Sequence, residues 1–266
     1  MAFAASPLPR YVSTSKVLVE RSAILIESLL LAVTRVSTFL GNQPLTGATG
    51  FFFERDGRLF LATSRHVVLD EASHHRPDRL AIELHLDAIN IGVVTQWSMP
   101  LYRGSQPLWR QGVDSGGSVD VVALEIQRSA LPESTLLSAF TPAHLVAQLD
   151  DIEVGAPVLI VGFPLGFHDH LHHLPVARQA VIASAFGIRF QGQGYFLTDA
   201  TMHRGTSGAP VVARMTAERS GRGELAWRLL GVHSARMDVS NRDIVEDERL
   251  DLNCAWYADV LLTLTE

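Results

Sequence analysis

The 266-residue chain contains a single cysteine, Cys254, and therefore cannot form a disulfide within itself. A fold without disulfides is compatible with a reducing compartment, so the cytoplasm is the expected location. Lysine is equally scarce, because Lys16 stands beside 21 arginines that are spread along the chain without a cluster. The formal net charge of −6 and the lack of a basic stripe argue against nucleic-acid binding.

Long apolar runs are missing as well. The most apolar early stretch, residues 17–33, is interrupted by Glu20, Arg21 and Glu27, so neither a membrane span nor a secretion signal is expected. Hydrophobic residues make up 47% of the chain and charged residues 19%, a balance typical of a packed globular protein. Residues 1–23, rich in small residues, Ser and Pro, predict a flexible segment before a folded unit over residues 24–266.

Short apolar runs separated by turn residues dominate the folded unit and predict an all-β fold. The clearest hairpin joins residues 50–54 to residues 59–63 through a turn at Asp56 and Gly57. The other predicted strands cover residues 81–86, 119–126, 156–163, 180–185, 195–198, 210–215 and 227–232. Residues 105–118, rich in Gly, Ser and Gln, predict a long loop.

Two helices are expected to interrupt the strands. Thr141 as a cap and Pro142 at the first helical position predict a helix over residues 142–149, between two halves of the chain. The second is predicted over residues 253–264, with Asn253 as its cap. Its apolar face would comprise Cys254, Tyr257, Val260, Leu261 and Leu264.

The sharpest motif is Gly205-Thr206-Ser207-Gly208-Ala209-Pro210. A turn at Gly205 lets consecutive backbone amides point into one concavity beside the Ser207 hydroxyl, which is how main chain builds an oxyanion hole. The pattern G-x-S-G-x-P is expected by chance only roughly 0.005 times in a chain of this composition, so a plain Ser-Gly turn is the less favoured interpretation.

A nucleophilic serine needs a general base, and the base needs an orienting carboxylate. His66 follows directly after the second strand of the predicted hairpin. Asp120 opens a run apolar enough to be buried on both faces, where a carboxylate is costly unless it is hydrogen-bonded. Bonding the His66 imidazole would remove that cost and leave the other ring nitrogen free to accept the Ser207 proton.

Four segments, taken together and in this order, resemble the trypsin-like (chymotrypsin-fold) serine proteases, and among them the disulfide-free bacterial HtrA-like branch. The segments are residues 47–68 with the hairpin and His66, residues 119–124 with Asp120, residues 161–166 with a Gly-Phe-Pro-Leu-Gly loop, and residues 198–210 with Ser207. No residue follows Glu266 to form a PDZ domain, so a protease unit without one is expected.

The resemblance implies two six-stranded antiparallel β-barrels, over residues about 24–135 and about 150–251, followed by the C-terminal helix. It implies His66 as general base, Asp120 as its orienting partner and Ser207 as nucleophile. The backbone amides of Gly205 and Ser207 would form the oxyanion hole. The expected function is a serine endopeptidase that hydrolyses protein or peptide substrates through an acyl-enzyme, with no cofactor and no metal.

Two other functions are alternatives to a serine endopeptidase. An α/β-hydrolase would need the elbow G-x-S-x-G and a histidine after the acid, but residue 209 is Ala and His233 is the last histidine. A catalytically silent module that binds peptides or partner proteins stays open, because a motif does not report turnover.

A substrate-binding pocket is expected from the residues before the nucleophile and from a later strand, since these positions form the pocket in the resembled family. The residues are Thr201, Met202, His233, Ser234 and Arg236. A histidine at the place of His233 donates to Glu or Gln of the substrate in some relatives, and Arg236 would favour Glu by charge. The alternatives are a structural strand histidine and a preference for small apolar residues.

Five residues within six positions invite a zinc interpretation: His168, Asp169, His170, His172 and His173. No cysteine or helical H-x-x-x-H pair fixes a geometry, so a solvated loop is favoured and no metal ligand is assigned. Cys254 is expected to be a core thiol rather than a reactive group.

Overall fold

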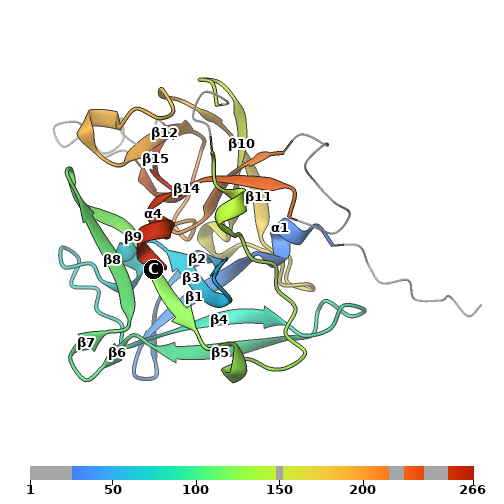
Figure 1. Cartoon of the computed structure of the whole chain (residues 1–266). Coiled ribbons are helices and arrows are strands. Elements are labelled where there is room, and N and C mark those ends of the chain that lie inside the picture. The colour runs from blue at the N-terminus through green and yellow to red at the C-terminus, as the bar shows by residue number, and fades with distance from the viewer. Residues whose placement is uncertain (1–25, 148–151, 216–224, 237–250) are drawn as a thin grey trace, which may run out of the picture.

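The computed structural model describes residues 26–147, 152–215, 225–236 and 251–266. The predicted flexible segment, residues 1–23, lies outside these residues. Strands dominate the described chain, which confirms the all-β class, and Figure 1 shows them in two groups. Strands β1–β9 form one group and strands β10–β15 the other, with the C-terminal helix between them.

The first group is a seven-stranded antiparallel sheet in the order β5-β4-β1-β2-β3-β9-β8. Its strands are β1 (Val33–Leu40), β2 (Gln43–Arg55), β3 (Arg58–Thr63), β4 (Arg79–His85), β5 (Val94–Pro100), β8 (Trp109–Asp114) and β9 (Gly117–Ile126). A small hairpin of β6 (Tyr102–Arg103) and β7 (Gln106–Pro107) lies between β5 and β8.

This sheet is rolled around a core to which all seven strands contribute. The core includes Val36, Phe52, Leu61, Leu80, Met99, Trp109 and Leu124. The edge strands are β5 and β8. The end of β5 lies near the start of β8, because the Leu108 amide donates a 2.9 Å bond to the Leu101 carbonyl. The seventh strand, β8, lies in the predicted loop over residues 105–118, because the buried Trp109 anchors this polar stretch to β9.

The second group is a closed barrel of six strands in the order β10-β11-β12-β15-β14-β13, as expected. The strands are β10 (Pro157–Gly162), β11 (Val176–Ile182), β12 (Tyr195–Asp199), β13 (Pro210–Arg214), β14 (Trp227–Arg236) and β15 (Leu252–Tyr257). A two-barrel, chymotrypsin-like architecture follows from the rolled sheet and this barrel together.

Strand β3, most of β9 and residues 48–53 of β2 are buried on both faces, which explains their largely apolar sequences. Along β9, Val121 and Ala123 face the interface between the barrels, whereas Val122 and Leu124 face the first barrel's interior. The period of two residues separates the two cores. The second barrel contributes side chains such as Trp256 to the same interface, so the two halves share one apolar contact.

The predicted helix over residues 253–264 is wrong in its first half. Asn253, Cys254 and Tyr257 lie in β15, where they pair with β12 or β14, and only α4 (Val260–Leu264) is helical. Asn253 caps no helix; its side-chain nitrogen donates to the carbonyls of Ala200 and Asp251. The closed barrel needs a sixth strand, and that pairing outweighs the local helical pattern.

The remaining short elements connect the strands. They are α1 (Ser28–Leu31), α2 (Arg65–Val68), η1 (Arg128–Ala130), η2 (Pro142–His144), η4 (Pro164–Gly166) and η5 (Phe190–Gly192). The helix predicted from Thr141 begins there, with a capping box to His144, but it is a single 3-10 turn. Among the described residues, no helix is long and apolar enough to cross a membrane.

Candidate active site

His66 lies at the start of a single helical turn that follows β3. Ser64 precedes this turn in extended backbone, and the buried side chains of Val67 and Val68 fix the turn to the first barrel's core. The His66 side chain is left about one-third exposed, at 36%. The sequence therefore presents an imidazole at the edge of the first barrel on a well-anchored backbone.

Asp120, near the beginning of β9, binds both the ring and the backbone of His66. Its Oδ2 lies 2.7 Å from His66 Nδ1, and its Oδ1 accepts a 2.9 Å bond from the His66 amide. Ser234 also donates its hydroxyl to Oδ2. These bonds satisfy the half-buried carboxylate and orient the imidazole with Nε2 away from Asp120.

The pKa of His66 reflects two opposing influences. Burial lowers it, but the hydrogen bond to Asp120 and the negative charges of Asp120 and Asp70 outweigh burial, so the pKa lies above its ordinary value. The imidazole is thereby made a stronger base than a free histidine, which suits a group that takes a proton during a reaction.

The Ser207 turn depends on two glycines with left-handed backbone. Gly205 has φ of +93° and Gly208 has φ of +86°. A Cβ on Gly205 would lie 2.5 Å from the Phe163 carbonyl oxygen, and one on Gly208 would collide with Thr49 and Thr63. Both glycines are therefore required by close backbone approach as well as by φ.

The backbone carbonyl of His233 joins the serine turn to the histidine turn. It accepts a 2.7 Å bond from the Gly208 amide and a 3.2 Å bond from the Ser64 hydroxyl. The same oxygen therefore binds Gly208, which follows Ser207, and Ser64, which lies two residues before His66. The turns that carry the predicted nucleophile and base, from different barrels, are thus joined through one carbonyl oxygen of β14.

The amides of Gly205 and Ser207 have no hydrogen-bond partner within the part of the chain that the structure describes. The Arg204 carbonyl, which belongs to the same peptide unit as the Gly205 amide, accepts a 2.6 Å bond from the Leu165 amide. Because a trans peptide points its C=O and N–H in opposite directions, this bond also fixes the direction of the Gly205 N–H. Two oriented amides beside a serine can stabilise an oxyanion.

Thr49 is a residue of this site to which sequence analysis assigned no role. Its hydroxyl donates to the Gly205 carbonyl at 2.7 Å and accepts from the Phe163 amide at 3.1 Å. Its amide donates to the Ser207 carbonyl at 3.0 Å. This fully buried side chain holds the serine turn against the loop that begins at Phe163. The sequence offered only its place in the first matched segment.

We expect Thr49→Val to lower kcat about tenfold or more with little change in KM. Valine keeps the volume but leaves the Gly205 carbonyl and the Phe163 amide unpaired, which costs about 1–3 kcal/mol and loosens the oxyanion turn. Steady-state kinetics well below the melting temperature would measure this. Thr49→Ser, which keeps the hydroxyl, should restore kcat; equal rates in both variants would contradict a positioning role.

The predicted pocket residues have unlike environments. Thr201 is exposed and donates its hydroxyl to Asp251 at 2.9 Å, whereas Met202 is buried in the second barrel's own core. The Ser234 hydroxyl is engaged by Asp120, so only its backbone is free to meet a substrate. Arg236 pairs through its backbone with Asn253 at the end of β14. Their role in a substrate pocket stays a prediction.

His233 is buried, and its backbone is hydrogen-bonded to Gly208 and Ala209, the two residues after Ser207. Burial, assisted by the nearby His66, lowers the pKa of His233 to about 4, so the ring is neutral at pH 7. Its Nδ1 is buried and has no hydrogen-bond partner in the described part of the chain. A neutral imidazole carries one N–H, and a buried unpaired nitrogen is cheaper as an acceptor, which favours the proton on Nε2.

Cys254 lies on β15 rather than on the final helix, paired with Leu197 of β12. Burial raises the pKa of its thiol to about 11, with a small opposing effect from Tyr195. A thiol with such a pKa is almost entirely protonated at neutral pH and is a poor nucleophile. Cys254 is thus unsuited to replace Ser207 as the reacting group.

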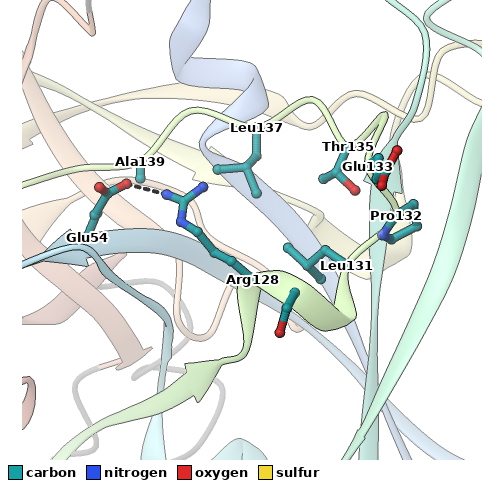
Figure 2. Close-up of a pocket in the computed structure, with 9 residues that line it drawn as sticks. Glu54, Arg128, Leu131, Pro132, Glu133, Thr135, Leu137 and Ala139 are labelled. Carbon is teal, nitrogen blue, oxygen red and sulfur yellow. Dashed lines mark hydrogen bonds and ion pairs between the residues drawn. The ribbon is translucent and has the colours of Figure 1, made fainter.

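Two pockets bear on where ligands could bind. A pocket of about 290 Å³ adjoins the oxyanion turn and is lined by Arg35, Gly47, Ala48, Phe163, Leu165, Gly166, Arg204 and Gly205. Figure 2 shows another of about 530 Å³, where an ion pair between Arg128 and Glu54 lies beside Leu137. That second pocket contains none of the predicted site residues, so it is separate from the candidate active site.

Residues 48–217 match the family model of the trypsin-like peptidase domain. The chain belongs to this family. The match covers more than half of the chain and contains His66, Asp120 and Ser207. No curated protein sequence matches the chain significantly.

Solved structures show the same fold. The HtrA-type protease AlgW, solved with a tripeptide, is 18% identical with a TM-score of 0.52; 89% of this chain and 59% of that chain are covered. A serine endoprotease from Yersinia pestis is 16% identical with a TM-score of 0.50, covering 89% and 62%. This trypsin-like peptidase therefore spans about three-fifths of the length of these two proteins.

Proposed function

We propose that this peptidase is a serine endopeptidase that works through an acyl-enzyme on Ser207. The Ser207 oxygen attacks the scissile carbonyl carbon while His66 Nε2 takes the hydroxyl proton. His66 then gives that proton to the leaving amine as the C–N bond breaks. Water then attacks the acyl carbonyl carbon while the same imidazole takes a proton from it. His66 passes this proton to the Ser207 oxygen as the ester C–O bond breaks, which releases the acid product and restores Ser207.

The observation that carries this proposal is the paired anchoring of His66. Asp120 binds both the His66 ring and its backbone amide, and the His233 carbonyl holds the turns of His66 and Ser207 together. The unpartnered amides of Gly205 and Ser207, within the described residues, supply donors for the oxyanion. A fold kept only for binding would not require an imidazole oriented by a carboxylate on a turn that is bonded to the serine turn.

The test is labelling with a fluorescent organophosphonate, which reacts with an activated serine. We expect one label on Ser207, located by peptide mass spectrometry, in folded protein at neutral pH. Heat-denatured protein and Ser207→Ala are the controls, and neither should be labelled. Absence of labelling in folded wild-type protein would overturn the endopeptidase and favour the silent peptide-binding module.

For substrate preference, we propose that His233 donates from Nε2 to the side-chain carbonyl of Glu or Gln before the scissile bond. Its pKa of about 4 leaves the ring neutral, so hydrogen bonding rather than charge is the contribution of His233. The attraction of Glu over Gln would come from Arg236, as the sequence suggests. The burial of His233 and its backbone bonds to Gly208 and Ala209, the two residues after Ser207, support a place for His233 in the pocket wall.

A positional-scanning peptide library is expected to show enrichment of Glu or Gln before the cut in the wild type. His233→Ala should abolish that enrichment, and Arg236→Gln should reduce the ratio of Glu to Gln without abolishing both. Enrichment of Val, Ala or Leu in the wild type would refute this preference and leave His233 as a structural residue of β14.

A further inference from the structure

Three potential metal ligands from the two barrels converge at a point outside the proposed catalytic machinery. Glu83 comes from β4 of the first barrel, and His168 and His173 come from the loop that follows η4 in the second. One ligand atom from each lies within 4.8 Å of the other two. Within the histidine-rich stretch of the sequence, therefore, only two of the four histidines meet the carboxylate.

Two of these ligand atoms are buried and have no hydrogen-bond partner among the residues that the structure describes. They are Glu83 Oε2 and His173 Nδ1, which lie 3.5 Å apart. The Glu83 side chain is only 11% exposed. A buried carboxylate oxygen and a buried ring nitrogen that make no hydrogen bond are costly, and a cation bound by both would remove that cost.

The third ligand, His168, is held in the tautomer that a metal requires. Its Nδ1 lies 2.6 Å from the Gly166 carbonyl oxygen. A carbonyl oxygen can only accept a hydrogen bond, so Nδ1 carries the proton. Nε2 is then unprotonated and has a lone pair available for a cation. Such a backbone carbonyl behind a ligating histidine is the usual support in zinc sites. His168 itself is 6% exposed.

We propose that Glu83, His168 and His173 form a zinc site that joins the two barrels. Two imidazoles and one carboxylate are a preferred zinc ligand set, and bond lengths of about 2.0–2.2 Å around a tetrahedral ion separate neighbouring ligands by about 3.4 Å. The 3.5 Å between His173 Nδ1 and Glu83 Oε2 already matches that separation. The fourth ligand is water or His170, whose ring lies 4.5 Å from that of His168.

Arg35 sets the expected strength of this site. Its Nη1 lies 3.6 Å from Glu83 Oε1, on the carboxylate oxygen that is not used for zinc. The guanidinium repels a second cation, so zinc binds less tightly than at a ligand set without a neighbouring positive charge. Removing that charge in Arg35→Gln is therefore expected to tighten zinc binding, whereas removal of a ligand weakens it.

The site is mechanically connected to the oxyanion turn. His168 binds the Gly166 carbonyl, and the preceding residue, Leu165, holds the Arg204 carbonyl of the peptide unit that carries the Gly205 amide. Gly92 leaves room for this loop, because a Cβ there would lie 2.7 Å from the Leu171 carbonyl oxygen. An ion that ties the loop to β4 would stabilise this chain of contacts.

Isothermal titration of the full-length, chelator-treated protein with zinc chloride tests the site directly. We expect one zinc ion per chain, at least about tenfold weaker affinity in His173→Asn and Glu83→Gln, and tighter binding in Arg35→Gln. Asparagine suits position 173 because the backbone there is left-handed, with φ of +57°. His74→Asn, which removes an exposed imidazole at another left-handed position, is the matched control and should bind zinc as the wild type does.

Two further measurements separate binding from misfolding and from activity. Cobalt(II) in place of zinc should give the intense visible absorption of tetrahedral coordination in the wild type and not in His173→Asn. The melting temperatures of the wild type and of His173→Asn should match without metal. Zinc should raise the melting temperature of the wild type and not that of His173→Asn. Absence of stoichiometric zinc binding, or equal affinity in wild type and His173→Asn, would overturn the proposal and leave a Glu83–His173 ion pair.

An effect of zinc on hydrolysis rests on the proposed function, but zinc binding does not. If both hold, adding zinc should change kcat in the wild type and not in His173→Asn. An inactive protein that still binds zinc would refute the endopeptidase and leave the zinc site standing. An active protein that binds no zinc would do the reverse.

Discussion

Ser207→Ala is expected to lower kcat/KM for peptide hydrolysis by about 10³-fold or more. Only the hydroxyl is removed, while the Ser207 carbonyl keeps its bond to the Thr49 amide and the Gly208 amide keeps its bond to the His233 carbonyl. We therefore expect an unchanged melting temperature. Initial rates on a fluorogenic peptide, with active enzyme counted by organophosphonate labelling, would measure the loss.

His66→Ala should cost about as much as Ser207→Ala, because base and nucleophile act as a unit. The double variant should lose little beyond either single variant. His74→Asn is a suitable control for loss of a first-barrel histidine, since His74 is exposed and its left-handed backbone suits asparagine. Losses of only a few fold in Ser207→Ala or His66→Ala would mean that the nucleophile or the base is another residue.

The sequence predicted those parts of the fold that depend on local patterns. The run around Val121 to Leu124 was apolar at every position, and this strand is indeed buried on both faces, between two cores. The C-terminal helix was overestimated because β15 is a strand only through its partners. One partner, β12, precedes it by more than fifty residues, and no local periodicity reports such a pairing.

The supporting residues of the site were out of reach for the same reason. Thr49 holds Gly205 across 156 positions, and Ser234 holds Asp120 across 114. Both bonds join a side chain to a group brought near only by the packing of the two barrels. Short motifs revealed the residues proposed to react, since these lie within recognisable turns, but not the hydroxyls that hold them in place.

The histidine-rich loop shows the same limit for metal ligands. Its imidazoles were visible in the sequence, but the carboxylate that meets them, Glu83, lies on β4 of the other barrel. Without that partner, spacing alone did not distinguish His168 and His173 from His170 and His172. Only the fold separates two converging rings from their solvated neighbours.

Asp120→Asn should reduce kcat/KM by about 10³–10⁴-fold and should move the acid limb of the pH profile to lower pH. Asp120 accepts hydrogen bonds at both carboxylate oxygens, from His66 Nδ1 and from the His66 amide, whereas asparagine has only one acceptor oxygen. The imidazole therefore loses its orientation and its productive tautomer. The hydrogen bond and charge of Asp120 raise the pKa of His66 against burial. Without them burial dominates, the pKa falls, and the base stays unprotonated to lower pH.

The profile of kcat/KM against pH, measured from the acid side to neutrality, would test this shift. His233 does not obscure it in the wild type, because its pKa of about 4 places its titration lower. Asp70→Asn is the matched control: it removes a second charge that raises the pKa of His66, so its acid limb should also move down while its plateau rate is retained. An unmoved acid limb in Asp120→Asn would show that His66 is not the titrating base. Collapse of folding would instead mark Asp120 as a structural residue, because its carboxylate fastens the backbone amide of His66 as well as the ring.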